Sequence, residues 1–239
     1  MLKFFSSLRD TFPINRIMDF LDRIIIESIR YGRGRRYDAR QYWSERFSKF
    51  GLSLKASGNR RISEEANRRL YDAAKKAFIK ICDKAGIEFS RLRVLDIGCG
   101  TGVYTRLFYE YGVKDYVGLD ITDVLFPRLK EQFSEYRFIK KDITTDSLSG
   151  TFDLIIMIEV IEHIVDKDKL VFCLENIMSC LSEDGWFIVA PIFDVSKRAL
   201  SYVRYWSLDD IKPLLSGCTI KASEPFTTGR VIAVTKDRG

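Results

Sequence analysis

Long apolar runs are missing from this chain of 239 residues. The longest strictly apolar stretches are about five residues, as at Leu154–Ile158, whereas a membrane-spanning helix needs about 20. No C-x-x-C pair occurs either, which argues against a zinc motif and a disulfide framework. The five scattered cysteines are Cys82, Cys99, Cys173, Cys180 and Cys218. We find no small-residue cleavage site of a secretory signal near residue 1, so we expect a cytoplasmic protein.

Acidic residues are scarce in only one part of the chain. Residues 1–60 hold 13 Lys/Arg and 6 Asp/Glu, a net charge of +7, and the remaining residues have a net charge of −1. Within this segment lies a basic run of Arg30, Arg33, Arg35, Arg36 and Arg40. The run suits a solvated basic surface, contact with an anionic membrane, or a phosphate-tracking patch for nucleic acid. The aliphatic residues of the first expected helix favour the membrane over nucleic acid.

From residue 92 onward the pattern alternates between apolar strands and helices. We expect strands over residues 92–97, 115–119, 137–140, 153–159 and 186–191, and helices over residues 103–111, 124–133, 168–181 and 207–215. Two final strands, 219–223 and 230–235, have no helix between them and should pair antiparallel. The pattern predicts an α/β fold, a doubly wound and mostly parallel sheet with helices on both faces.

Residues 1–89 are expected to form a basic, helical N-terminal extension to a second domain over residues 90–239. Helical spacing relates seven apolar residues, namely Ile14, Ile17, Met18, Leu21, Ile24, Ile25 and Ile29. A longer helix should begin after Ser63, which caps it, and end at Gly86.

The stretch VLDIGCGTG, residues 94–102, is the most informative motif. Its glycines at 98, 100 and 102 follow a strand and open a helix, where missing side chains let a ligand approach the backbone. The dinucleotide fingerprint G-x-G-x-x-G fails because residue 103 is Val. Asp96, just before the first glycine, would repel a pyrophosphate and attract an ammonium or sulfonium group. The loop therefore favours a nucleoside-bearing cation.

Two more carboxylates follow the next two strands. Asp120 ends the second strand, where it can accept hydrogen bonds from ribose hydroxyls. Asp142 follows the third strand, where it can accept a hydrogen bond from an adenine amino group while Ile143 packs on the ring. Each Asp alone is more typical of a helix cap or a turn, but the three carboxylates behind one glycine loop together indicate a nucleoside site.

These stretches, together with FDLIIMIEVIEHI (residues 152–164) and LSEDGWFIVAPI (residues 181–192), resemble the motifs of class I S-adenosylmethionine-dependent methyltransferases. The similarity is to the ubiquinone-biosynthesis O-methyltransferase-like branch and covers about residues 90–235. It implies a seven-stranded sheet with the last strand antiparallel, and an N-terminal lid with Tyr37, Tyr42 and Trp43 as candidates. It also implies that S-adenosylmethionine is held by Asp96, Gly98, Cys99, Gly100, Gly102, Asp120, Ile121, Asp142, Ile143, Ile158 and Glu159.

The segment EVIEHI, residues 159–164, contains the only histidine of the chain. It resembles the segment with which metal-using relatives hold a divalent cation, and this makes Mg²⁺ on Glu159, Glu162, His163 and Asp194 one interpretation. In a second interpretation His163 is a metal-free general base, and in a third the cluster orients the cofactor or caps a helix. We favour Glu159 and His163 as lining the methyl-transfer site without a required metal.

The acceptor atom is expected to be an oxygen or a nitrogen of a small-molecule, glycan or lipid-linked compound. By the same resemblance Arg204 borders the acceptor pocket, where it either holds an anionic group or stacks on Trp206. One alternative is an RNA methyltransferase that uses the basic N-terminal segment, although the second histidine of the small-RNA 3′-terminal enzymes is missing. The other is a non-catalytic, cofactor-binding partner subunit. Peripheral membrane contact through the N-terminal segment remains a further expected interaction.

Overall fold

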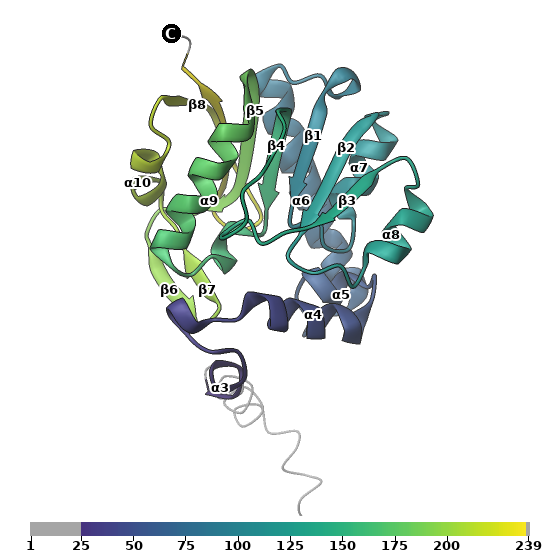
Figure 1. Ribbon diagram of the computed structural model, residues 1–239, viewed down its shortest axis with the longest axis vertical. Coiled ribbons are helices and arrows are strands. Elements are labelled where there is room, and N and C mark those ends of the chain that lie inside the picture. Colours follow the sequence, from purple (N-terminus) through teal and green to yellow (C-terminus); the bar gives the residue numbers. More distant parts are fainter. Residues whose placement is uncertain (1–24, 238–239) are drawn as a thin grey trace, which may run out of the picture.

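A seven-stranded sheet forms the centre of the computed structural model, which describes residues 25–237 (Figure 1). The strand order is β3-β2-β1-β4-β5-β9-β8, and β9 runs antiparallel to both of its neighbours while β1 to β5 pair in parallel. The strands are β1 (Arg93–Ile97), β2 (Asp115–Asp120), β3 (Arg137–Lys140), β4 (Phe152–Ile158), β5 (Leu181–Ile192), β8 (Cys218–Pro225) and β9 (Arg230–Lys236). The expected doubly wound sheet with its last strand antiparallel is confirmed.

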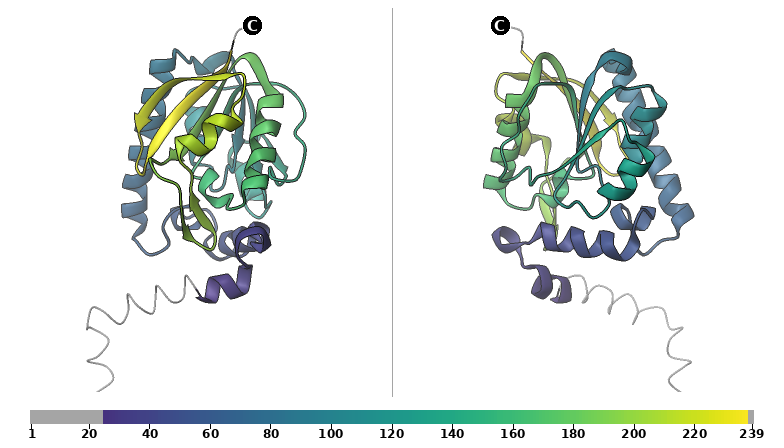
Figure 2. Two further views of the ribbon diagram at one scale, coloured as in Figure 1. Left: turned by 90° about the vertical axis from the view of Figure 1, so that its left-hand side faces the viewer. Right: turned by 45° about the vertical axis from the view of Figure 1, so that its right-hand side comes forward.

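Helices cover both faces of this sheet (Figure 2). They are α3 (Glu27–Tyr31), α4 (Ala39–Phe50), α5 (Leu54–Ser57), α6 (Glu64–Ala85), α7 (Val103–Glu110), α8 (Phe126–Gln132), α9 (Lys167–Cys180) and α10 (Leu208–Ile211). Along β4, Leu154 and Ile156 belong to the core with α6, α7 and α8, whereas Ile155 and Met157 belong to the core with α9 and α10. Because successive side chains of a strand point to opposite faces, β4 is apolar throughout.

Helices α4 and α5 lie across the edge at which the parallel strands end (Figure 1). Phe47 of α4, Ala56 of α5 and Phe78 of α6 are buried in the same core as the residues of the sheet. Helix α6 packs against β8 and β9. Most of the helix expected from Ile14 to Ile29 lies outside the described residues, and its last part coincides with the start of α3. The domain division between residues 89 and 90 stays a prediction.

Three local features differ from the sequence prediction. An unexpected two-stranded ribbon, β6 (Lys197–Leu200) with β7 (Val203–Tyr205), follows β5. Strand β5 begins at Leu181 and not at residue 186 as predicted, so the polar residues before Trp186 belong to the strand. Helix α10 ends at Ile211 and passes into the 3-10 turn η6 (Lys212–Leu214), which contains Pro213, a residue that lacks a backbone N–H to continue a helix. Ser207 and Asp210 form a capping box at the start of α10.

No helix among residues 25–237 is both long enough and apolar enough to cross a membrane.

Candidate active site

Backbone hydrogen bonds hold the glycine loop between β1 and α7 against the end of β2. The N–H of Gly98 donates to the carbonyl oxygen of Leu119 at 2.7 Å, and the N–H of Gly100 donates to the Asp120 carboxylate at 3.0 Å. Gly98 has φ +75°, and a Cβ there would lie 2.3 Å from Cγ2 of Val160. The close approach of the segment after β4 therefore requires glycine at position 98.

A first cavity of about 500 Å³ lies over this loop. It is lined by nine of the eleven residues predicted to hold the cofactor, namely Gly98, Cys99, Gly100, Asp120, Ile121, Asp142, Ile143, Ile158 and Glu159. The N-terminal segment closes another side of it, with residues 34–40, Trp43 and Phe47. The carboxyl edge of the sheet and the N-terminal segment thus enclose one space, as the lid interpretation requires.

Asp96 and Gly102, the other two predicted residues, are outside the lining of this cavity as far as the described residues define it. Asp96 lies buried beneath the loop, where the hydroxyl of Tyr116 donates to its Oδ2 at 2.6 Å. Burial raises the pKa of the Asp96 carboxyl to about 7. Gly102 has φ +81°, and a Cβ there would lie 2.6 Å from Cδ2 of Leu129, so this glycine serves the packing of α8.

The two strand-end carboxylates are both held in place by neighbouring donors. Asp120 accepts from the N–H groups of Gly100 and Thr122, at 3.0 and 3.1 Å, while burial raises its pKa to about 6. Oδ1 of Asp142 accepts from the N–H and the hydroxyl of Thr144, at 2.9 and 2.6 Å. Asp142 is therefore a turn residue and a cavity residue at once, so the two sequence interpretations do not exclude each other.

The first cavity also contains a buried polar atom that lacks a partner. Tyr104 lines the cavity and is 7% exposed, and its hydroxyl makes no hydrogen bond within the described part of the chain. A buried hydroxyl without a partner costs free energy, which a polar ligand in the cavity would recover. Glycine loop, carboxylates and hydroxyl together fit a polar nucleoside ligand.

Glu159 adopts a strained backbone conformation. Its φ of +60° is the one positive value at a non-glycine residue between residues 25 and 237. Its N–H donates to the carbonyl oxygen of Ala190 at 2.8 Å, and its Oε1 accepts from Thr227 at 3.4 Å. Such strain persists where the surrounding structure enforces it, and it is concentrated at functional sites.

A second cavity, of about 360 Å³, meets the first. Five residues line both cavities and define their junction, namely Trp43, Ser57, Tyr71, Glu159 and His163. The sequence interpretation had placed Glu159 and His163 here and had named Trp43 as a lid residue, but it missed Ser57 and Tyr71. Those two belong to α5 and α6, where no motif separates a cavity residue from a core residue.

His163 is held as a neutral imidazole at the junction. Its Nδ1 lies 3.1 Å from the carbonyl oxygen of Tyr202, and because a carbonyl can only accept, Nδ1 carries the proton and Nε2 carries the lone pair. The ring of Trp43 lies edge-on at 5.0 Å between centroids. Burial lowers the pKa of His163 to about 4, so the imidazole is uncharged and able to accept a proton at neutral pH.

Glu162 is buried next to Glu159, and its Oε2 has no hydrogen-bond partner among the residues described. Burial and the neighbouring Glu159 raise the pKa of Glu162 well above its usual range, and burial raises the pKa of Glu159 too. No group of three or more His, Cys, Asp or Glu side chains between residues 25 and 237 is placed to hold a metal ion. The ligand set required by the magnesium interpretation is therefore not assembled, and we derive no step through a metal.

Arg204 stacks on an indole ring. Its guanidinium carbon lies 3.8 Å from the ring centroid of Trp206. Its neighbours Val203 and Tyr205 line the second cavity, whereas Arg204 is in the lining of neither cavity as the described residues form them. Of the two interpretations of Arg204, the geometry agrees with stacking.

Comparisons with known proteins identify methyltransferases in each case. The sequence profile of the methyltransferase-domain family matches residues 35–220. The chain is similar to the ubiquinone biosynthesis O-methyltransferase of Methylococcus capsulatus, with 31% identity over 85 residues that make up 33% of this chain and 35% of that protein. It is also similar to the (S)-coclaurine N-methyltransferase of Thalictrum flavum, with 29% identity over 51% of this chain and 34% of that protein. The chain thus spans about a third of the length of these relatives.

Among solved structures, the DhpI–SAH complex has a TM-score of 0.63 to this chain, with 17% identity, covering 84% of this chain and 96% of that one. At 17% sequence identity, this similarity shows a shared fold.

The buried carboxyl of Asp96 should make stability depend on pH. The unfolded chain titrates this group near pH 4 and the folded chain near pH 7, so the folded state binds the proton more tightly. The resulting contribution to the free energy of unfolding is complete below about pH 4 and is lost as the pH rises to about 7. Asp96→Asn does not titrate, so we expect the variant to gain stability relative to wild type between pH 5.5 and pH 8.

Urea unfolding of both proteins at both pH values measures this difference. Asp123→Asn is the control, because Asp123 is an exposed residue whose pKa is lowered by Lys140, and its effect should be the same at both pH values. An equal effect of Asp96→Asn at the two pH values would show that Asp96 titrates normally.

Proposed function

The chain belongs to the methyltransferase-domain family, with class I S-adenosylmethionine-dependent motifs and fold, and from this premise we propose that it methylates an oxygen or nitrogen atom of a small-molecule, glycan or lipid-linked acceptor. The observation that carries this proposal is the junction of two cavities at Glu159 and His163. One cavity has the residues of a nucleoside site, and the other provides separate space for an acceptor.

The residues that line the first cavity suit the adenine, ribose and methionine parts of S-adenosylmethionine. In the proposed arrangement Asp120 accepts hydrogen bonds from the ribose, and Asp142 with Ile143 holds the adenine. The glycine loop leaves room for the methionine part, while the ionised form of Asp96 beneath the loop favours a positively charged ligand. The sulfonium end then lies toward Glu159, where the cavities meet.

Bound S-adenosylmethionine would supply an electrophilic methyl group: the acceptor atom bonds to the methyl carbon in line as the bond between that carbon and sulfur breaks, and S-adenosylhomocysteine leaves as a neutral thioether. The chain contributes mainly alignment, which can supply much of the rate. A hydroxyl acceptor also loses a proton, and Nε2 of His163 and the carboxylate of Glu159 are the two proton acceptors at the junction. Burial lowers the pKa of His163, so its imidazole stays unprotonated and free to accept a proton, whereas burial raises the pKa of Glu159 and makes its carboxyl easier to protonate.

Asp120 should contribute strongly to cofactor affinity. Asp120→Ala removes charge-assisted hydrogen bonds worth roughly 1.5–3 kcal/mol, so we expect at least about tenfold weaker binding of S-adenosylmethionine with the fold intact. Isothermal calorimetry measures the affinity, and circular dichroism checks the fold. Asp123→Ala, three residues further on and outside both cavities, should bind as wild type does. An unchanged affinity of Asp120→Ala for S-adenosylmethionine would contradict the ribose assignment. Tight binding of NADH by the wild type would contradict the proposed function.

The role of His163 can be separated from that of a metal. We expect methyl transfer from labelled S-adenosylmethionine into fractionated cell extract to survive a chelator. His163→Ala should lower the rate by about 100-fold or more, with cofactor affinity within a few fold of wild type. Because the pKa of His163 is lowered to about 4, the imidazole is already in its basic form at pH 6, and its titration should add no rise in rate near pH 6.5.

Two results would contradict this account of the junction. Loss of activity with chelator and its return with added Mg²⁺ would restore the metal interpretation. A fully active His163→Ala would assign the histidine a structural role, and Glu159→Gln then tests the remaining base.

We also propose that the beginning of the described chain contacts an anionic membrane surface. Ile25, Ile26 and Ile29 are 48%, 57% and 80% exposed around α3, next to Arg30, whose side chain is 59% exposed. Exposed aliphatic and basic residues on one short segment suit the interface of an anionic bilayer.

Flotation with phosphatidylserine vesicles tests this contact. We expect Ile26→Ser combined with Ile29→Ser to reduce the floated fraction several-fold, because the variant loses apolar surface for insertion. Leu70→Ser, which changes an equally apolar residue that is 48% exposed on α6, should float as wild type does. Equal flotation of all three proteins would rule the membrane contact out.

A further inference from the structure

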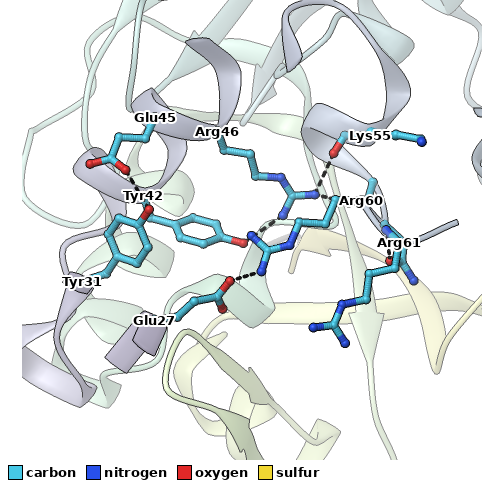
Figure 3. A network of polar contacts seen from close by, with 10 residues as sticks. Glu27, Tyr31, Tyr42, Glu45, Arg46, Lys55, Arg60 and Arg61 are labelled. Atoms are coloured by element: carbon cyan, nitrogen blue, oxygen red, sulfur yellow. Dashed lines mark hydrogen bonds and ion pairs between the residues drawn. The ribbon is translucent and has the colours of Figure 1, made fainter. Parts of the chain in front are cut away.

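Tyr104, which lines the first cavity, has a buried hydroxyl that the described part of the chain leaves without a hydrogen-bond partner. Two tyrosines of the N-terminal segment show the usual arrangement. The hydroxyl of Tyr42 accepts from Arg46 at 2.9 Å (Figure 3). In the same network the hydroxyl of Tyr31 donates to Glu45 at 2.8 Å. Because buried polar groups are nearly always paired, the exception at Tyr104 indicates a polar group supplied by a ligand.

The ring of Tyr104 is fixed by packing. Tyr104 lies in the first turn of α7, directly after the glycine loop. Its ring lies edge-on to that of Phe78 of α6, with 5.3 Å between the ring centroids, and both rings belong to one buried core. The packing holds the hydroxyl in place before a ligand arrives, so binding costs little conformational freedom at this side chain.

The hydroxyl lies toward the end of the first cavity that meets the second. Burial raises the pKa of Tyr104 well above its usual range, and nearby Glu159 and Tyr71, both residues of the junction, raise it further. Asp120 and Asp142 follow β2 and β3, which lie on the other side of β1 from β4, the strand that leads to Glu159. The hydroxyl is therefore on the methionine side of a ligand whose ribose and adenine lie at these two carboxylates.

The chemistry of the hydroxyl suits that end of the ligand. Since its pKa is raised, the hydroxyl of Tyr104 keeps its proton at neutral pH and can both donate and accept. The methionine part of S-adenosylmethionine carries an ammonium and a carboxylate group, and hydrogen bonds to charged groups are stronger than those between neutral groups. A ligand without these groups would leave the buried hydroxyl unpaired, which disfavours its binding.

Tyr37 is a second tyrosine of the first cavity whose buried hydroxyl lacks a partner in the described chain. Its ring packs against those of Tyr42 and Tyr202, at 6.2 and 6.4 Å between centroids, in an apolar cluster separate from the core that contains Tyr104. Burial and these two tyrosines raise the pKa of Tyr37. Its hydroxyl thus lies near other aromatic side chains, and we assign no ligand group to it.

We propose that the hydroxyl of Tyr104 binds the zwitterionic amino-acid group of S-adenosylmethionine and so selects a nucleoside with an intact methionine part. This inference rests on the proposed function, because that function assigns the first cavity to the cofactor.

Calorimetry with two ligands tests the assignment on the full chain. S-adenosylhomocysteine keeps the amino-acid group, whereas methylthioadenosine has the same adenosine thioether without it. Tyr104→Phe keeps the ring against Phe78 and removes only the hydroxyl. We expect the variant to bind S-adenosylhomocysteine about fivefold or more weakly than wild type does, and to bind methylthioadenosine within about twofold of wild type.

The stability of the ligand-free protein separates a binding role from a structural one. Because the hydroxyl of Tyr104 has no partner in the described chain, Tyr104→Phe should be at least as stable as wild type in urea. Tyr116→Phe is the contrasting variant and should lose stability, since the hydroxyl of Tyr116 donates to Asp96 at 2.6 Å. Tyr109→Phe is the matched control on α7. Tyr109 is 49% exposed and outside both cavities, so this variant should match wild type in both measurements.

Three results would overturn the assignment. Equal loss of affinity for both ligands would place the hydroxyl at the nucleoside, and unchanged affinity for both would show that it binds neither part. A marked loss of stability or failure to fold in Tyr104→Phe would give the hydroxyl a structural role. A wild type that binds neither ligand is a different result, because it contradicts the proposed function and not only the role of Tyr104.

Discussion

Parallel pairing of β1 to β5 is the constraint on which the candidate site depends. The carboxyl ends of parallel strands lie at one edge of the sheet, so residues that are far apart in sequence lie close together there. The hydrogen bonds of Gly98 and Gly100 to the end of β2 then set the position of the glycine loop. Once this edge is formed, the N-terminal segment needs only to lie across it to enclose a cavity.

The parts of the site that could be predicted from sequence are the local ones. The glycine loop and the strand-end residues Asp120 and Asp142 follow from short motifs, because a strand end and its turn are encoded within a few residues. The positive φ of Glu159 has no such signal, since the contacts around it, from its N–H to Ala190 and from Val160 to the loop at Gly98, join segments that are far apart in sequence.

The second cavity could not be predicted, because many separate parts of the chain form it. Residues of α4, α5, α6, the segment after β4, the ribbon β6–β7 and the turn between β8 and β9 contribute side chains, together with Phe193, and no sequence spacing relates them. The sequence analysis expected Arg204 at the border of the acceptor pocket. Strand alternation in β7 places Arg204 over Trp206, while the neighbouring Val203 and Tyr205 face the cavity.

The five residues shared by the two cavities have a thermodynamic consequence. Trp43, Ser57, Tyr71, Glu159 and His163 line both cavities, so under the proposed function the side chains that one ligand orders would already be ordered for the other. Linkage then makes any coupling between the two binding events reciprocal, whichever ligand enters first. If the two cavities hold cofactor and acceptor as proposed, a common wall of this kind would couple their two binding equilibria.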